Sequence, residues 1–180
     1  DRPAFRNVVV NGLVLAADGR KMSKRLKNYP DPKYMLETYG ADALRLYLMN
    51  SPVVRAEDLR FSEEGVQNSM RHLLIPLWNA YSFFVTYARI DRWTPDQIPA
   101  QPSPHQLDRW ILSSLETLAA EVTAAMDAYD LQRAVRPFVR FIEDLTNWYI
   151  RRSRRRFWKS QNDDDKLHAF ATLYQVLLEF

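Results

Sequence analysis

Apolar residues recur every three or four positions in four long segments of the chain, which is the spacing of an amphipathic helix. The four segments run over about 62–88, 105–128, 131–157 and from 163 onward. A proline-rich stretch at 93–104 separates the first two segments and reads as a connector. Pro76 and Pro137 lie inside helical patterns, so we expect a kink or bend at each. The pattern after residue 62 therefore predicts an antiparallel helix bundle.

The first third of the chain has a different pattern. Residues 5–16 are rich in valine and leucine and predict a β element, in which Asn11-Gly12 marks either a hairpin turn or a close backbone approach. Residues 31–40 predict a helix capped by Asp31 and stopped at Gly40, and a second short helix follows before residue 52. Residues 53–61 are expected to be irregular or a short strand. The fold class is mainly α, a helix bundle preceded by a short β element.

Composition narrows the class of protein. Hydrophobic residues make up 47% and charged residues 26% of the 180 positions, which is typical of a globular chain. There is no cysteine, which excludes disulfides and thiolate metal sites in this chain, and the three histidines have no metal-ligand spacing. No apolar run approaches the roughly 20 residues that span a bilayer, and the first residues do not resemble a signal peptide. A cytoplasmic protein without a metal site is the expectation.

Basic residues are concentrated in two blocks although the net charge is only +3. The first block consists of Arg20, Lys21, Lys24, Arg25 and Lys27. The second consists of Arg151, Arg152, Arg154, Arg155, Arg156 and Lys159. Clustered positive charge indicates a polyanionic ligand such as nucleotide phosphates or a nucleic-acid backbone.

The first block follows the turn signal Asp18-Gly19, so we expect it on a loop rather than on a helix. Lys21 and Lys24 lie three positions apart with Ser23 between them, and two ammonium groups on a mobile loop can neutralise the charge of a departing pyrophosphate. A solvated surface run or a nuclear-targeting patch is the alternative that the charges alone leave open.

Four stretches of sequence carry a family resemblance. They are KMSKR at 21–25, NYPDP at 28–32, YGADALRLYLMNSPVVRAEDLRF at 39–61 and DLTNWYIRRSRRRFW at 144–158. Together they resemble the isoleucyl-tRNA synthetases, a branch of the class I aminoacyl-tRNA synthetases, whose signature loop reads Lys-Met-Ser-Lys-Ser. Arg25 stands where that loop commonly has serine, which is similar to the eukaryotic-like branch of the family.

The resemblance implies an enzyme that uses ATP and Mg²⁺ to activate isoleucine and then transfers it to the terminal ribose of isoleucine tRNA. It places Lys21, Met22, Ser23 and Lys24 at the ATP site, with Lys21, Ser23 and Lys24 as the catalytic residues. Lys24 is expected to have the largest effect on the leaving pyrophosphate, and Met22 to pack the loop against its domain. None of the three histidines fits the family's His-Ile-Gly-His motif, so we expect no aminoacylation and no bound cofactor in this chain alone.

The second block lies on a predicted helix. Arg151 and Arg155 fall on one side with Arg154 beside them, and Arg152 and Arg156 fall on an adjacent strip. With Lys159, these arginines are candidates for tRNA contact, because the family binds the anticodon arm with the helical bundle that follows the signature loop. Pairing of some arginines with nearby acids is the alternative. The aromatic neighbours Trp148, Tyr149, Phe157 and Trp158 are expected to be core residues rather than base-stacking groups.

The resemblance also implies a domain organisation. Residues 1–30 would end a catalytic nucleotide-binding domain, 31–61 would form a connecting region that contacts the tRNA stem, and 62–180 would begin an anticodon-binding domain. The chain starts without methionine and stops inside an apolar pattern, so we expect a piece of a longer protein. A valyl-tRNA synthetase, a non-catalytic helical RNA-binding module and a structural helical adaptor remain the alternatives.

Overall fold

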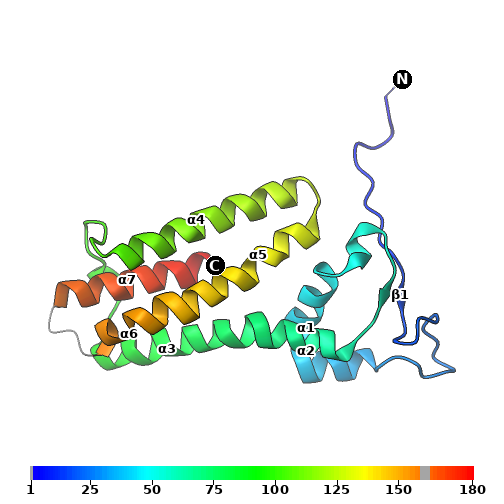
Figure 1. The fold of residues 1–180 in the computed structure, drawn as a ribbon, viewed down its shortest axis with the longest axis horizontal. Helices are drawn as coiled ribbons and strands as arrows, with labels where there is room; N and C mark the ends of the chain where they lie inside the picture. The colour runs from blue at the N-terminus through cyan, green and yellow to red at the C-terminus, as the bar shows by residue number, and fades with distance from the viewer. Residues whose placement is uncertain (1, 159–162) are drawn as a thin grey trace. The chain divides into compact units, whose positions relative to one another are not determined.

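The computed structural model describes residues 2–158 and 163–180, which form two compact units. The first unit comprises Asp1–His72 and Glu121–Arg136, and the second comprises Leu73–Ala120 and Pro137–Phe180. Figure 1 follows the chain through both units. The basic loop lies in the first unit and the basic helix in the second.

The first unit contains a small parallel sheet. Strands β1 (Val14–Leu15) and β2 (Leu59–Arg60) pair with Val14 opposite Leu59. Before β1, Gly12 donates its N–H to the carbonyl of Val53 at 2.8 Å, and a Cβ at Gly12 would collide with the backbone carbonyl of Glu57. Asn11-Gly12 is therefore a close backbone approach and not a hairpin turn.

The predicted β element over residues 5–16 is wrong for most of its length. Only Val14 and Leu15 are in a strand, because β2 offers just two residues for pairing and residues 2–13 have no partner strand in the described chain. Phe5, Val8, Val9 and Val10 consequently have exposed side chains. Valine-rich composition predicts a strand only where a second strand satisfies its backbone N–H and C=O groups.

Two helical segments cover the next part of the first unit. Helix α1 spans Pro32–Met49 and is interrupted at Gly40, whose φ of 80° and ψ of 160° are not helical. Asp31 caps it by accepting a hydrogen bond from the Lys33 N–H at 2.7 Å. Both features confirm the expected cap and the expected stop at glycine. The short 3₁₀ helix η1 (Pro52–Arg55) follows.

Helix α2 (Glu63–Ser69) packs against α1. Ser62 caps it by accepting from the Gly65 N–H at 3.2 Å, and acidic residues occupy its first turn, where the helix dipole favours them. Tyr39 of α1 donates its hydroxyl hydrogen to Glu63 at 2.7 Å. The first unit is thus held by an α1–α2 pair that adjoins the small sheet.

The second unit is built from long helices. Its elements, some of which begin or end in the first unit, are the π-helical turn η2 (Met70–Leu74), α3 (Ile75–Asp91), the 3₁₀ turn η3 (Pro95–Gln97), α4 (Gln106–Asp127), α5 (Leu131–Glu143), the π-helical segment η4 (Asp144–Ile150), α6 (Arg151–Trp158) and α7 (Asp163–Glu179). Helix α7 packs on α3 and α6, and η4 also contacts α3. Successive long helices reverse direction, which confirms the predicted antiparallel bundle (Figure 1).

At Pro76, one of the two predicted kinks, the helix widens into a π-helical turn. Pro76 lacks an N–H, and its ring crowds the carbonyl four residues earlier, so the chain widens into the π turn η2 immediately before α3. Helix α5 continues through Pro137, and the wider segment η4 begins seven residues later.

Aromatic side chains form the centre of the second unit. The rings of Trp93 and Phe170 stack with centroids 5.8 Å apart, and Phe157 meets Phe170 edge-on at 5.1 Å. Phe84 meets Trp93 edge-on at 5.7 Å. Such offset and edge contacts stabilise aromatic cores beyond simple burial. They join α3, α6 and α7 around one apolar centre.

Candidate phosphate-binding loop and nucleic-acid interface

A tight turn leads from β1 into the basic loop. The Gly19 N–H donates to the carbonyl of Ala16 at 2.8 Å, and the Ala16 N–H donates to the carbonyl of Arg20 at 2.9 Å. Gly19 has a φ of 81°, a left-handed conformation that glycine adopts at little cost. Asp18 accepts from the Arg20 backbone N–H at 3.0 Å and from its Nε at 2.7 Å, and these bonds lower the pKa of Asp18. The turn directs the chain back beside β1.

One asparagine ties the two sides of the loop together. Lys21 forms an isolated antiparallel bridge with Leu15. The Ser23 N–H donates to Asn28 Oδ1 at 2.9 Å, and Asn28 Nδ2 donates to the carbonyl of Lys21 at 3.2 Å. Lys27 closes the loop with a φ of 46°. The backbone of residues 21–28 is therefore organised locally, without a helix or strand of its own.

The cations of this loop lack anionic partners. Lys21, Lys24, Arg25 and Lys27 are exposed, and none of them has a salt bridge within residues 2–158 and 163–180. Arg20, by contrast, is paired with Asp18. Met22 and Ser23 are half-buried. The loop thus presents several uncompensated charges, an arrangement that suits a phosphate chain.

The exposed arginines of the second block lie on α6. Arg151, Arg152, Arg154 and Arg155 are exposed. The Arg152 guanidinium lies 5.2 Å from the ring centroid of Trp148, and that of Arg154 lies 5.9 Å from the ring centroid of Phe83. Arg151 and Arg155 have no ion-pair partner among the described residues. Lys159, the remaining candidate of this block, lies outside the described residues.

Arg156 has a different position from the other arginines of the block. Its side chain is only 9% exposed and forms a bidentate pair with Asp108, with Nη1 at 2.6 Å and Nη2 at 2.9 Å from the carboxylate oxygens. Its Nε donates to both carboxylate oxygens of Asp165 at 3.0 Å. The acids that pair with Arg156 are thus not its nearest acidic neighbours in the sequence. With its donors occupied in the interior, Arg156 holds the bundle together.

Asp108 is the centre of this buried network. It also accepts hydrogen bonds from the hydroxyls of Ser103 at 2.6 Å and Tyr149 at 2.9 Å. Burial alone would raise the pKa of Asp108, but the bonds from Arg156 and Ser103 outweigh it and lower that pKa. Burial raises the pKa of Tyr149 well above its ordinary value. Sequence reasoning missed Asp108, because its partners are far away in the chain.

The four aromatic neighbours of the block divide into two kinds. Tyr149 and Phe157 are fully buried, as predicted. The prediction is wrong for Trp148 and Trp158, whose side chains are exposed. In η4, the side chains of Trp148 and Tyr149 therefore point in different directions, with Tyr149 reaching Asp108 and Trp148 facing solvent.

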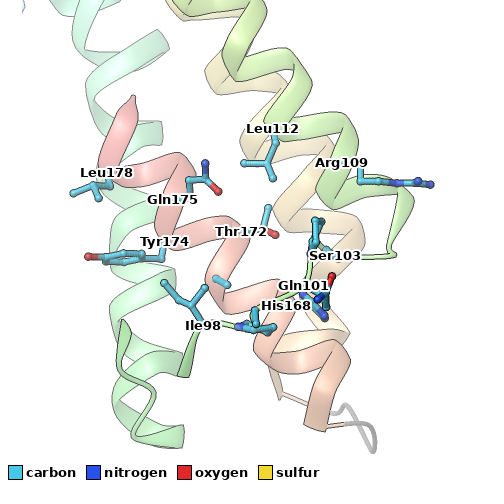
Figure 2. Close-up of a pocket in the computed structure, with 14 residues that line it drawn as sticks. Ile98, Gln101, Ser103, Arg109, Leu112, His168, Thr172, Tyr174, Gln175 and Leu178 are labelled. Carbon is cyan, nitrogen blue, oxygen red and sulfur yellow. The ribbon is translucent and has the colours of Figure 1, made fainter. Parts of the chain in front are cut away.

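A separate hollow of about 420 Å³ lies between α4, α7 and the proline-rich connector (Figure 2). Its walls include Leu112, Thr172 and Tyr174, while the guanidinium of Arg109 extends outward. None of the site residues predicted from sequence lines it.

Residues 2–158 and 163–180 contain neither a cluster of metal ligands nor a helix that could span a membrane. No group of three or more histidine, aspartate or glutamate side chains is placed to hold a metal ion. No described helix has the length and apolar character needed to cross a membrane.

Both parts of the chain match known protein families. Residues 1–60 match the family of class I tRNA synthetases for I, L, M and V, and residues 108–180 match the anticodon-binding domain of tRNA ligases. The chain is 58% identical over 180 residues to an isoleucine–tRNA ligase of Chlamydia muridarum and 56% identical over 179 residues to one of Protochlamydia amoebophila. These alignments cover 100% and 99% of the chain but only 17% of each relative.

Solved structures support the fold. A Mycobacterium tuberculosis methionyl-tRNA synthetase in complex with methionyl-adenylate matches 89% of the chain and 31% of its own with a TM-score of 0.64 at 22% identity. A leucyl-tRNA synthetase from Agrobacterium radiobacter, in a ternary complex with tRNA and LeuAMS, matches 94% of the chain and 20% of its own with a TM-score of 0.60 at 19% identity. At these identities the likeness supports the arrangement of helices alone.

Proposed function

Because this chain belongs to the class I tRNA synthetases, we propose that it is the segment of an isoleucine–tRNA ligase that joins an ATP-contacting loop to a tRNA-binding helical bundle. The proposal is carried by one observation: the loop at 21–27 presents several cations that have no salt bridge to any described residue, at the position of the family signature. In the proposed reaction, ATP and Mg²⁺ activate isoleucine and the product is transferred to isoleucine tRNA in the cytoplasm.

The positive charges of the loop stabilise the negative charge of the leaving group. Lys21 and Lys24 are exposed on a backbone that Asn28 ties together, so their ammonium groups can approach a phosphate chain without first breaking an ion pair. Charge that develops on the departing pyrophosphate is then neutralised by groups already in place, which lowers the barrier. Ser23 contributes its hydroxyl at the same site, and Met22 anchors the loop.

The test of this role is isoleucine-dependent ATP–pyrophosphate exchange in the intact ligase that contains this segment. Lys24→Ala is expected to slow exchange by about 100- to 1,000-fold, the loss typical of removing one preorganised donor to a developing charge. Lys27→Ala is the matched control, because Lys27 is an exposed lysine of the same loop outside the signature. Near-normal exchange by Lys24→Ala, or equal losses in both variants, would contradict the assigned role.

The bundle contributes tRNA binding through α6. Arg151, Arg154 and Arg155 are exposed on one helix, where guanidinium groups suit the phosphates of an RNA backbone. Arg152 completes the exposed set. Arg156 is left out of the proposed interface because its donors are directed to Asp108 and Asp165.

A further inference from the structure

A groove of about 620 Å³ lies beside the basic helix, between the start of α4 and the outer face of η4. Trp110 and Trp148 line it together with Asp144, Arg152 and His105. Figure 1 shows these parts of α4 and the α5–α6 run within the same bundle. The groove therefore combines two indole rings, a guanidinium and a carboxylate within one unit.

The aromatic side of the groove is preorganised. Trp148 is 54% exposed, so much of its indole ring is accessible to a ligand. Its position is fixed from beneath, because the next residue, Tyr149, is fully buried and donates a hydrogen bond to Asp108. Arg152 lies 5.2 Å from the ring centroid. An indole and a guanidinium held together in this way form a platform on which a flat, electron-rich ring can stack.

The polar side of the groove has unused hydrogen-bonding capacity. Asp144 is half-buried, and its carboxylate has no hydrogen bond or salt bridge within residues 2–158 and 163–180. His105 accepts from the Leu107 N–H through Nδ1 at 3.2 Å, which leaves its Nε2–H directed elsewhere. A carboxylate accepts hydrogen bonds only, so it selects a ligand edge that presents N–H donors.

We propose that this groove binds one unpaired nucleobase of the tRNA, with guanine as the best fit. This inference rests on the proposed tRNA-binding function and adds a stacking site to it. The base stacks on the Trp148–Arg152 platform, while the backbone phosphates on either side of its nucleotide are neutralised by the neighbouring arginines of α6. Guanine presents two adjacent N–H donors on its Watson–Crick edge and pairs both with the Asp144 carboxylate, whereas uracil presents one donor between two carbonyl groups.

The experiment compares three RNAs as ligands of the complete 180-residue chain. The probes are a hairpin with a loop of seven uridines, the same hairpin with one loop uridine replaced by guanosine, and a blunt duplex of equal charge. We expect the guanosine hairpin to bind most tightly. Trp148→Ala should weaken hairpin binding by about 5- to 150-fold, the range for losing one base stack, and leave duplex binding unchanged. Trp78→Ala is the matched control, because Trp78 is an exposed tryptophan outside the groove.

Asp144→Asn tests the base preference separately. An amide replaces one acceptor oxygen by a donor, so the variant should bind both hairpins but lose the preference for guanosine. Equal loss of hairpin and duplex binding in Trp148→Ala, or no loss in either, overturns the stacking site while RNA binding by the bundle stands. If the unsubstituted chain binds none of the three RNAs, the proposed tRNA-binding function fails together with the groove.

Discussion

Removing the Arg156 guanidinium should destabilise the second unit more than any other arginine substitution on α6. Arg156→Met keeps a long apolar side chain but deletes five hydrogen bonds, two to Asp108, two to the Asp165 carboxylate and one to the Asp165 carbonyl. Asp108 would stay buried with only the hydroxyls of Ser103 and Tyr149 as partners. Breaking a buried ion pair in this way costs about 3–5 kcal/mol of the free energy of unfolding.

That magnitude is a large part of the stability of a domain, which is typically about 5–15 kcal/mol. Replacing both partners should cost less than the sum of the two single changes, since no lone charge is left inside. For Asp108→Leu combined with Arg156→Met, we expect a coupling of about 0.5–3 kcal/mol.

The assay is urea unfolding followed by circular dichroism, with the free energy of unfolding extrapolated linearly to water. Arg155→Met is the matched control: Arg155 is the preceding residue of the same helix, is exposed and has no salt bridge to a described residue, so its replacement should change stability by about 0.5 kcal/mol or less. A loss below about 1 kcal/mol in Arg156→Met, or equal losses at both positions, would refute the reasoning that the buried network supports the bundle.

The pH dependence of the same variants gives a second signature. The pKa of Asp108 is lower in the folded protein than its ordinary value of about 3.9, so the unfolded chain binds more protons at low pH. The contribution of Asp108 to stability is therefore complete above that value and is lost as the pH falls through the folded pKa. In Arg156→Met the unpaired, buried carboxyl should have a raised pKa. The stability deficit of this variant should then shrink between pH 7 and pH 4.

Three further changes have outcomes that urea unfolding of the chain can measure. Gly12→Ala should cost about 1–3 kcal/mol, because the new Cβ collides with a backbone carbonyl and the segment must shift. Asp31→Ala removes the cap of α1 and should cost about 0.5–2 kcal/mol, whereas Asp31→Ser should retain most of the stability. Gly40→Ala should cost about 1–2 kcal/mol from backbone strain alone, since its φ is 80° and no side chain crowds the position. A neutral result at Gly12 or Gly40 would contradict the local geometry described above.

Helix boundaries could be predicted from the sequence because their signals are local. Asp31, Gly40 and Ser62 act on backbone groups within a few residues of themselves, so cap and stop positions follow from the sequence order. The strand over residues 5–16 could not be predicted correctly for the opposite reason. Its length depends on β2, which begins more than forty residues later and offers two residues for pairing.

The same distinction applies to the site. The loop cations at 21–27 form a contiguous block after a turn signal, and both features are visible in the sequence. Arg155 and Arg156 are adjacent and chemically identical, yet Arg155 is exposed and Arg156 is buried. Only Arg156 reaches Asp108, and the sequence does not reveal this contact because the two residues are 48 positions apart. Trp148 and Tyr149 are likewise adjacent aromatic residues, yet Trp148 is exposed and Tyr149 is buried against Asp108. Which arginine or aromatic faces inward is determined by tertiary packing.

The central claim, that this segment binds tRNA as part of an isoleucine–tRNA ligase, is tested most directly by binding of the chain to isoleucine tRNA and to an unrelated tRNA across a salt series. The account predicts tighter binding to isoleucine tRNA that weakens as salt rises, and a slope shallower by about 2 to 3 when Arg151, Arg154 and Arg155 are all replaced by alanine. Equal and weak binding to both tRNAs, unchanged by the triple substitution, would contradict it.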